Sequence, residues 1–249
     1  MYNYRSNLIH GPDLRSCFVH AQPIVVGYDH EILCDPDFPP VPGWISADEA
    51  AILWEIAHRI KGDWLEIGSQ TGWSGAHIAH LTGVRSVLML EPRLRERAFF
   101  ERWLENMDNV RQYDAPNAKA DTAILHPVAL RSDQYSVIGD QDFFDGVFID
   151  GDHDSPVPQL DAQFALSRLR PRGVIAFHDF GGPVLEAVKY LLQDHGTGGM
   201  HCRIYDTPQM VAVCWRGDFQ PPDHVSDPAH KEAFAARRAS MNFDFGVCK

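Results

Sequence analysis

Apolar and polar residues alternate along the chain in blocks that predict strands and helices in turn. Short apolar runs over residues 64–67, 86–90, 144–149 and 173–177 are typical of buried strands. Stretches between them have apolar positions three and four residues apart and predict helices, the clearest over residues 46–60. Strands that alternate with helices predict an α/β protein with a doubly wound, mostly parallel, Rossmann-like sheet.

The remaining segments suggest how the chain is divided. Residues 203–205 and 210–215 predict a C-terminal antiparallel hairpin. Residues 1–45 are rich in aromatic residues, histidine and proline, so we expect an N-terminal extension that serves as a lid, a pocket wall or an oligomer contact. Residues 46–216 then form the main domain, and residues 217–249 form a C-terminal link and a helix.

The first clear helix has a recognisable start. The run Ser46-Ala47-Asp48-Glu49 predicts a capping box, in which the acid at the fourth position bonds back to the helix start. An apolar stripe follows, and Gly62 predicts the end of the helix.

The segment DWLEIGSQTGWSG, residues 63–75, predicts a strand, a glycine turn and a helix. Gly68 and Gly72 leave space for a ligand, and free N–H groups at the helix start would face an anion. Gln70 stands where a dinucleotide fingerprint has its second glycine, which argues against a pyrophosphate. Glu66 adds a negative charge, so the turn favours a nucleotide-like ligand that also carries an amine.

Polar residues follow the ends of three further predicted strands. Glu91 lies nineteen residues after Gly72, where an acid can bind a ribose diol. The run from Asp150 to His153 and the pair His178-Asp179 follow two later strands. Because ligands of parallel sheets bind beyond the carboxyl ends of the strands, we expect these groups to converge on one crevice.

Four segments together resemble the class I S-adenosylmethionine-dependent methyltransferases: LEIGSQTGWSG, VLMLEPR, FDGVFIDGDHD and LRPRGVIAFHDF. The similarity extends over residues 63–215, and the last two segments resemble a subfamily with IDGDH and GGV…HD strand ends. The resemblance implies that residues 129–133 border the adenine. It also implies the remaining cofactor-binding residues, which are Glu66, Gly68, Ser69, Gly72, Glu91 and Asp150.

A more distant resemblance to metal-dependent small-molecule O-methyltransferases implies that Asp150 and Asp179 bind Mg²⁺. His178 falls where such enzymes present another oxygen ligand, and its softer nitrogen makes Mg²⁺ less suitable. The residues alone equally allow Asp150 to cap a turn and His178 to hydrogen-bond within the crevice. His153 and His178, with Asp150 beside them, are the catalytic candidates, and either histidine can serve as general base.

Other histidines and acids have simpler interpretations. His77 and His80 are expected on a helix surface or in packing, and Asp161 is expected to be a solvated or capping acid.

The amino-acid composition favours some kinds of binding partner over others. The 249 residues include 34 acidic and 22 basic ones, giving a net charge of −12 that disfavours nucleic acid and favours a small-molecule acceptor. Five scattered cysteines suit reduced thiols, and no apolar run is long enough to cross a membrane, so we expect a cytoplasmic protein without a membrane partner. The composition is compatible with a homo-oligomer and with a monomer.

The resemblance predicts methyl transfer from S-adenosylmethionine to a small molecule, with oxygen as the favoured acceptor atom and a divalent cation as an optional aid. One alternative is an NAD(P)-dependent oxidoreductase on a similar sheet, which Gln70 and Trp73 disfavour. Another is a regulatory protein that binds the cofactor without catalysis.

Overall fold

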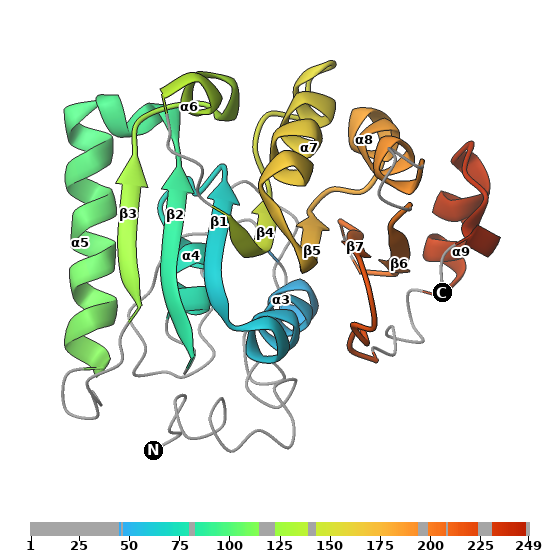
Figure 1. Cartoon of the computed structure of the whole chain (residues 1–249), viewed down its shortest axis with the longest axis horizontal. Helices are drawn as coiled ribbons and strands as arrows, with labels where there is room; N and C mark the ends of the chain where they lie inside the picture. Colours follow the sequence, from blue (N-terminus) through green and yellow to red (C-terminus); the bar gives the residue numbers. More distant parts are fainter. Residues whose placement is uncertain are drawn as a thin grey trace.

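The computed structural model describes residues 45, 47–79, 83–114, 123–138, 143–193, 199–207, 209–223 and 231–247. Its centre is a seven-stranded sheet in the order β3-β2-β1-β4-β5-β7-β6 (Figure 1). In chain order the strands are β1 (Gly62–Ile67), β2 (Val84–Leu90), β3 (Ile124–Val128), β4 (Phe144–Ile149), β5 (Leu169–Phe177), β6 (His201–Tyr205) and β7 (Val211–Trp215).

Helices connect these strands in the described part of the chain. The longer ones are α3 (Ala47–Ile60), α5 (Arg97–Asp114), α7 (Val157–Arg168), α8 (Gly182–Leu192) and α9 (Lys231–Ser240). The shorter ones are α4 (Trp73–Ala79), η1 (Pro92–Arg95), α6 (Ser132–Ile138) and η4 (Phe245–Val247). None of these described helices is both long and apolar enough to cross a membrane.

The pairing of the strands confirms the predicted fold class. β1 pairs in parallel with β2 on one side and with β4 on the other, while β3 and β5 extend the sheet outward. β7 is antiparallel to β5, and β6 is antiparallel to β7. The sheet is therefore doubly wound and mostly parallel, with the expected antiparallel pair at its C-terminal side.

Two apolar layers cover the faces of the sheet. Successive strand residues point to opposite faces, so Trp64 and Leu65 of β1 belong to different buried clusters. The cluster with Trp64 includes residues of α3, α4 and α5. The cluster with Leu65 includes residues of α7 and α8 (Figure 1). Helices on both faces leave the carboxyl ends of the strands as the natural place for a ligand.

The predicted domain boundaries stay predictions. Nearly all of the N-terminal extension, residues 1–45, lies outside the described residues, as do Ser46 of the predicted capping box and His80. The predicted C-terminal helix corresponds to α9.

One close contact fixes the pairing of the two central strands. Trp64 and Gly146 are direct neighbours on β1 and β4. The indole of Trp64 is fully buried, and its Nε1 donates a hydrogen bond to the backbone oxygen of Lys61 at 3.0 Å. A Cβ at Gly146 would lie 2.4 Å from two atoms of this ring. Glycine is therefore required here by space.

We expect Gly146→Ala to lower the free energy of unfolding by about 1–3 kcal/mol. The new methyl group would overlap the Trp64 ring, and neither the buried ring nor the central strand can move aside without losing other contacts. Urea unfolding followed by circular dichroism measures this loss. Gly181→Ala is the matched control, since the nearest atom to its Cβ would be the Met241 Cε at 3.6 Å. Equal stability of the two variants would contradict the packing argument.

Candidate functional site

A cavity lies at the carboxyl ends of the parallel strands. Its volume is about 750 Å³, which is large enough for a cofactor. It lies where the strand order reverses between β1 and β4, the usual ligand position in open α/β sheets. Turns after β1, β2, β4 and β5 and the start of α6 line it, and contribute Gly68, Glu91, Ser132, Asp150, His153 and Asp179.

Gly68 lets the ends of three strands meet at this cavity. Its φ is +87°, and a Cβ there would lie only 2.2 Å from the backbone oxygen of Asp150. The Gly68 N–H donates to the Leu90 oxygen, and the Asp150 N–H donates to the Ile67 oxygen, both at 2.9 Å. A side chain at position 68 would separate β1 from the end of β4.

Ser69 and Gly72, which were also predicted to bind the cofactor, are not among the described residues that line the cavity. Gly72 has a φ of +92°, and a Cβ there would lie 2.8 Å from the indole Nε1 of Trp103 in α5. Gly72 thus serves the packing of α5. The Ser69 hydroxyl is buried, and no described residue hydrogen-bonds to it. An unsatisfied buried hydroxyl beside a cavity suits a ligand.

Glu66 is completely buried behind the glycine turn. The hydroxyl of Ser74, in the first turn of α4, donates a hydrogen bond to its Oε1. Burial raises the pKa of Glu66 from 4.5 to about 8, against the lowering effect of the Ser74 hydrogen bond. A carboxyl of this kind ionises readily when a cation approaches, so its position suits a ligand that carries an amine.

Glu91 faces the cavity with both of its oxygens held in place. The backbone N–H of Gln70 donates to Oε2 and the backbone N–H of Arg93 donates to Oε1, each at 2.9 Å. Each carboxylate oxygen has a second lone pair, which is available to a ligand hydroxyl. Glu91 is therefore a fixed pair of acceptors at the end of β2.

The far side of the cavity is formed by α6 and α7. Residues 131–133 line it, as do Leu160 and Asp161 of α7. Asp161 was expected to be a solvated or capping acid, and this prediction is wrong. The side chain is buried and accepts a hydrogen bond from the Ser132 hydroxyl. Burial raises the pKa of Asp161 to about 6.

His178 lies between carboxylates rather than on the cavity surface. Its Nδ1 is 3.1 Å from both Asp150 Oδ1 and Asp179 Oδ2, and its side chain is 1% exposed. Its Nε2 is 3.2 Å from Glu49 Oε2. Burial disfavours the charged ring, but Asp150 and Glu49 outweigh burial and raise the pKa of His178 well above its usual value. A ring held on both nitrogens is poorly placed to take a proton from an acceptor.

Glu49 of α3 is a site residue that the sequence did not indicate. Its carboxylate is buried, and Oε1 accepts a hydrogen bond from the Gln209 backbone N–H at 2.8 Å. Two of its partners, His178 and Gln209, lie 129 and 160 residues away along the chain. In the sequence, Ser46 and Glu49 form a capping-box pattern, which already explains the acid at position 49. The local pattern therefore does not indicate that Glu49 contacts His178.

His153 is the histidine that faces the cavity, with 43% of its side chain exposed. Its Nδ1 is 3.6 Å from Asp179 Oδ2, and its Nε2 is 3.8 Å from Asp150 Oδ1. Asp150, His153 and Asp179 each offer a ligand atom, and these atoms lie within 4.8 Å of one another. The donor set therefore fits a divalent ion.

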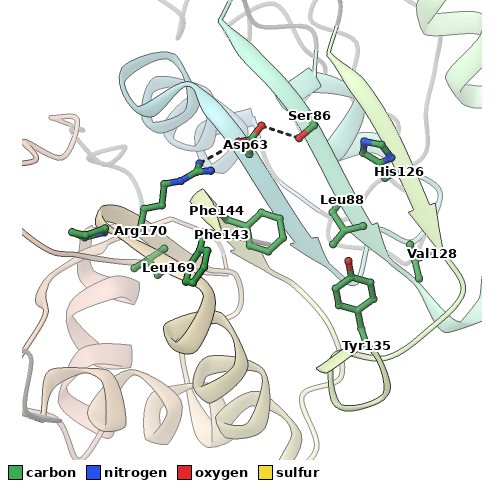
Figure 2. A pocket seen from close by; sticks show the side chains of 11 residues that line it. Asp63, Ser86, Leu88, His126, Val128, Tyr135, Phe143, Phe144, Leu169 and Arg170 are labelled. Atoms are coloured by element: carbon green, nitrogen blue, oxygen red, sulfur yellow. Dashed lines mark hydrogen bonds and ion pairs between the residues drawn. The ribbon is translucent and has the colours of Figure 1, made fainter. Parts of the chain in front are cut away.

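A second and larger cavity, of about 1020 Å³, lies on the sheet face near α6 (Figure 2). Phe143, Phe144 and Tyr135 line it, together with an ion pair of 3.1 Å between Asp63 and Arg170. Asp63 already bonds to Ser86 and Arg170, and it lies near the amino end of β1, opposite the glycine turn. The smaller cavity is therefore the candidate site, because the acid and histidine groups converge only there among the described residues.

Part of the chain matches a known protein family. Residues 65–180, just under half of the chain, match the family model described as "Methyltransferase domain". This part of the chain is therefore similar to methyltransferase domains. The match agrees with the predicted methyltransferase activity. A search of curated proteins finds no match to the chain.

Solved structures share the fold of this chain at low sequence identity. A cofactor-bound protein from MTB is 16% identical over 84% of this chain and 93% of its own, with a TM-score of 0.55. The O-methyltransferase TomG from Streptomyces achromogenes, solved with SAM, is 18% identical over 73% and 84%, with a TM-score of 0.50. The O-methyltransferase from Bacillus cereus, solved with SAH, is 17% identical over 67% and 80%, with a TM-score of 0.50.

We expect the buried Glu66 to make the methyltransferase less stable as the pH rises. Its pKa is about 4.5 in the unfolded chain and about 8 in the fold, so the folded protein holds a proton that the unfolded chain loses. This stabilisation is complete below about pH 4.5 and is lost as the pH approaches about 8. Between pH 5 and 8, wild type should lose about 1–4 kcal/mol more stability than Glu66→Gln.

Urea unfolding at several pH values checks this difference. Glu96→Gln, at an exposed acid, should follow wild type. Parallel stability curves for wild type and Glu66→Gln would show that Glu66 is ionised throughout.

Proposed function

We propose that this methyltransferase moves the methyl group of S-adenosylmethionine to an oxygen atom of a small molecule. The observation that carries the proposal is the cavity at the strand switch point, with Gly68 at one end and the fixed carboxylate of Glu91 beside it. Two similar structures are O-methyltransferases solved with SAM or SAH, which supports the same donor here.

The groups around the cavity suit each part of the donor. Glu91 would accept hydrogen bonds from the ribose diol through the lone pairs that the backbone leaves free. Residues 129–133, of which 131–133 line the cavity, would border the adenine. The Ser69 hydroxyl and the Glu66 carboxyl would bind the methionine part, because one lacks a partner and the other gains from a nearby cation.

The nicotinamide alternative fits this cavity less well. Gln70 has a φ of +44°, and its N–H is already bonded to Glu91 at 2.9 Å. A pyrophosphate needs free N–H groups and a glycine at this point of the turn. The same N–H bond causes no conflict for a ligand without phosphates.

His153 is the proposed general base. It faces the cavity, and Asp179 at 3.6 Å would stabilise the ring once it has accepted the proton of the acceptor hydroxyl. The sulfonium leaves as a neutral thioether, so most of the rate would come from holding the acceptor oxygen in line with the methyl group. His178, buried and held by Glu49 and Asp150, would position the acids instead.

Asp150 and Asp179 would hold a divalent ion at this site. Such an ion supplies positive charge that lowers the pKa of an acceptor hydroxyl. The two carboxylates lie on the same side of the cavity as His153.

Further proposals concern the rest of the protein. Residues 46–216 would be the methyltransferase domain, residues 217–249 a link and helix, and residues 1–45 a lid, pocket wall or oligomer contact. The net charge of −12 supports a small-molecule acceptor over nucleic acid. Cys202 and Cys214 are buried and form no disulfide bond with a described residue, which fits a cytoplasmic location.

Donor binding tests the proposal directly. We expect S-adenosylhomocysteine to bind the purified protein in isothermal titration calorimetry, and NADH to bind far more weakly. Glu91→Ala should weaken binding about 10–100-fold, because it removes hydrogen bonds to a charged acceptor. Glu96→Ala, which removes an exposed acid nearby, should bind as wild type. Preference for NADH would favour the oxidoreductase alternative.

A methyl-transfer assay tests His153 as the general base. Transfer of labelled methyl from S-adenosylmethionine to a panel of phenols and alcohols should yield an accepted substrate. With it, His153→Gln should lower kcat about 10²–10⁴-fold while S-adenosylhomocysteine binding changes little. His126→Gln, at an exposed histidine of β3, is the control. Full turnover by His153→Gln would remove the base assignment, and donor binding without transfer to any acceptor would favour a regulatory protein.

A further inference from the structure

A buried imidazole with a carboxylate behind it lies directly beside two other carboxylates. From this arrangement we propose that His178, oriented by Glu49, is a metal ligand together with Asp150 and Asp179. The mixed nitrogen and oxygen donors would select a divalent transition-metal ion over Mg²⁺. The inference rests on the proposed function only for its use in methyl transfer, because metal binding itself needs neither donor nor acceptor.

The spacing of the donor atoms supports a common ion. His178 Nδ1 is 3.1 Å from Asp150 Oδ1 and 3.1 Å from Asp179 Oδ2. Two ligands about 2.1 Å from an ion and at right angles to each other are about 3.0 Å apart. Both oxygen atoms therefore lie at the separation of a neighbouring ligand from the His178 nitrogen, and all three residues come from the carboxyl ends of β4 and β5.

The backbone after β5 is bent so that two consecutive residues reach the same place. Neighbouring residues of a strand normally point to opposite faces. Asp179 has a φ of +54°, which is unusual for a residue other than glycine. This conformation brings the Asp179 carboxylate to the same Nδ1 atom that belongs to His178. Strained backbone of this kind is concentrated at functional sites.

Glu49 decides which nitrogen of His178 is available. Its Oε2 lies 3.2 Å from Nε2, and its Oε1 is fixed by the Gln209 backbone N–H at 2.8 Å. An imidazole that donates from Nε2 to a carboxylate presents the lone pair of Nδ1 to an ion. A carboxylate in this position orients a metal-binding histidine and makes it a stronger ligand.

The surrounding charge also favours a cation. Glu49, Asp150 and Asp179 all approach the same ring, so one protonated imidazole leaves an excess of negative charge. A divalent ion would take the place of the Nδ1 proton and offset this excess more fully. His153 need not be a ligand, so it stays available as the proposed base.

The donor set argues against the Mg²⁺ that the distant resemblance implied. Mg²⁺ binds oxygen and keeps its waters, whereas imidazole suits ions such as Mn²⁺, Co²⁺ and Zn²⁺. The residue type at position 178 is therefore the feature that sets the metal preference.

Co²⁺ binding to the full-length, chelator-treated protein tests the proposal through the visible absorption of the bound ion. We expect wild type to bind Co²⁺ at least about 100-fold more tightly than Mg²⁺, measured by competition. His178→Asp, which supplies oxygen instead of nitrogen, should reduce that ratio at least about tenfold. Glu49→Gln should weaken Co²⁺ binding about 10–100-fold.

His126→Asp, the same substitution at an exposed histidine far from the cluster, should leave both affinities unchanged. If wild type binds Mg²⁺ as tightly as Co²⁺, or binds neither ion, the proposal is wrong, and in the second case His178 is a permanent buried cation. This decision uses wild type alone, so it holds even if a buried variant does not fold. Because no donor is present, the result is also independent of the S-adenosylhomocysteine test.

Discussion

The hydrogen bonds at the end of β1 are the constraint on which the site depends. β1 bonds on one side to the end of β2 through Gly68 and Leu90, and on the other to the residue after β4 through Ile67 and Asp150. These contacts bring Glu91 and the Asp150 loop to opposite sides of one turn. They are possible only because position 68 has no side chain. The cavity, the fixed carboxylate of Glu91 and the acid cluster all follow from this one meeting of three strand ends.

Burial of acids is the second theme of the site. Glu66, Asp161 and Glu49 are all buried polar residues near the cavity. Buried carboxyls are costly when charged, so each is either protonated or paired. Such a site favours cationic ligands, and a sulfonium cofactor with an amine is one of them. The buried acids therefore favour a ligand with the positive groups that the proposed donor carries.

Much of the fold and part of the site could be predicted from sequence. Alternating apolar periods gave the strand and helix order, because both faces of the sheet must be buried. Gly68 and Glu91 could be located because their roles depend on the backbone of neighbouring strand ends. Asp161 could not, because its burial depends on Ser132 of a different element. Glu49 could not either, because its partner His178 is brought close only by the tertiary fold. Gly72 was predicted in part. The glycine turn was expected from the sequence, but its packing against Trp103 of α5 was not.

The link from Glu49 to His178 has a consequence for how this site is inherited. The family match covers residues 65–180, which include Asp150, His178 and Asp179. Glu49 and its anchor Gln209 lie outside that region, on α3 and in the turn before β7. A domain cut at the family boundaries would keep every proposed ligand and lose the group that orients one of them. The properties of the proposed metal site would therefore also depend on α3 and on the turn before β7. Exchanging these two elements between relatives would change the site without altering a ligand.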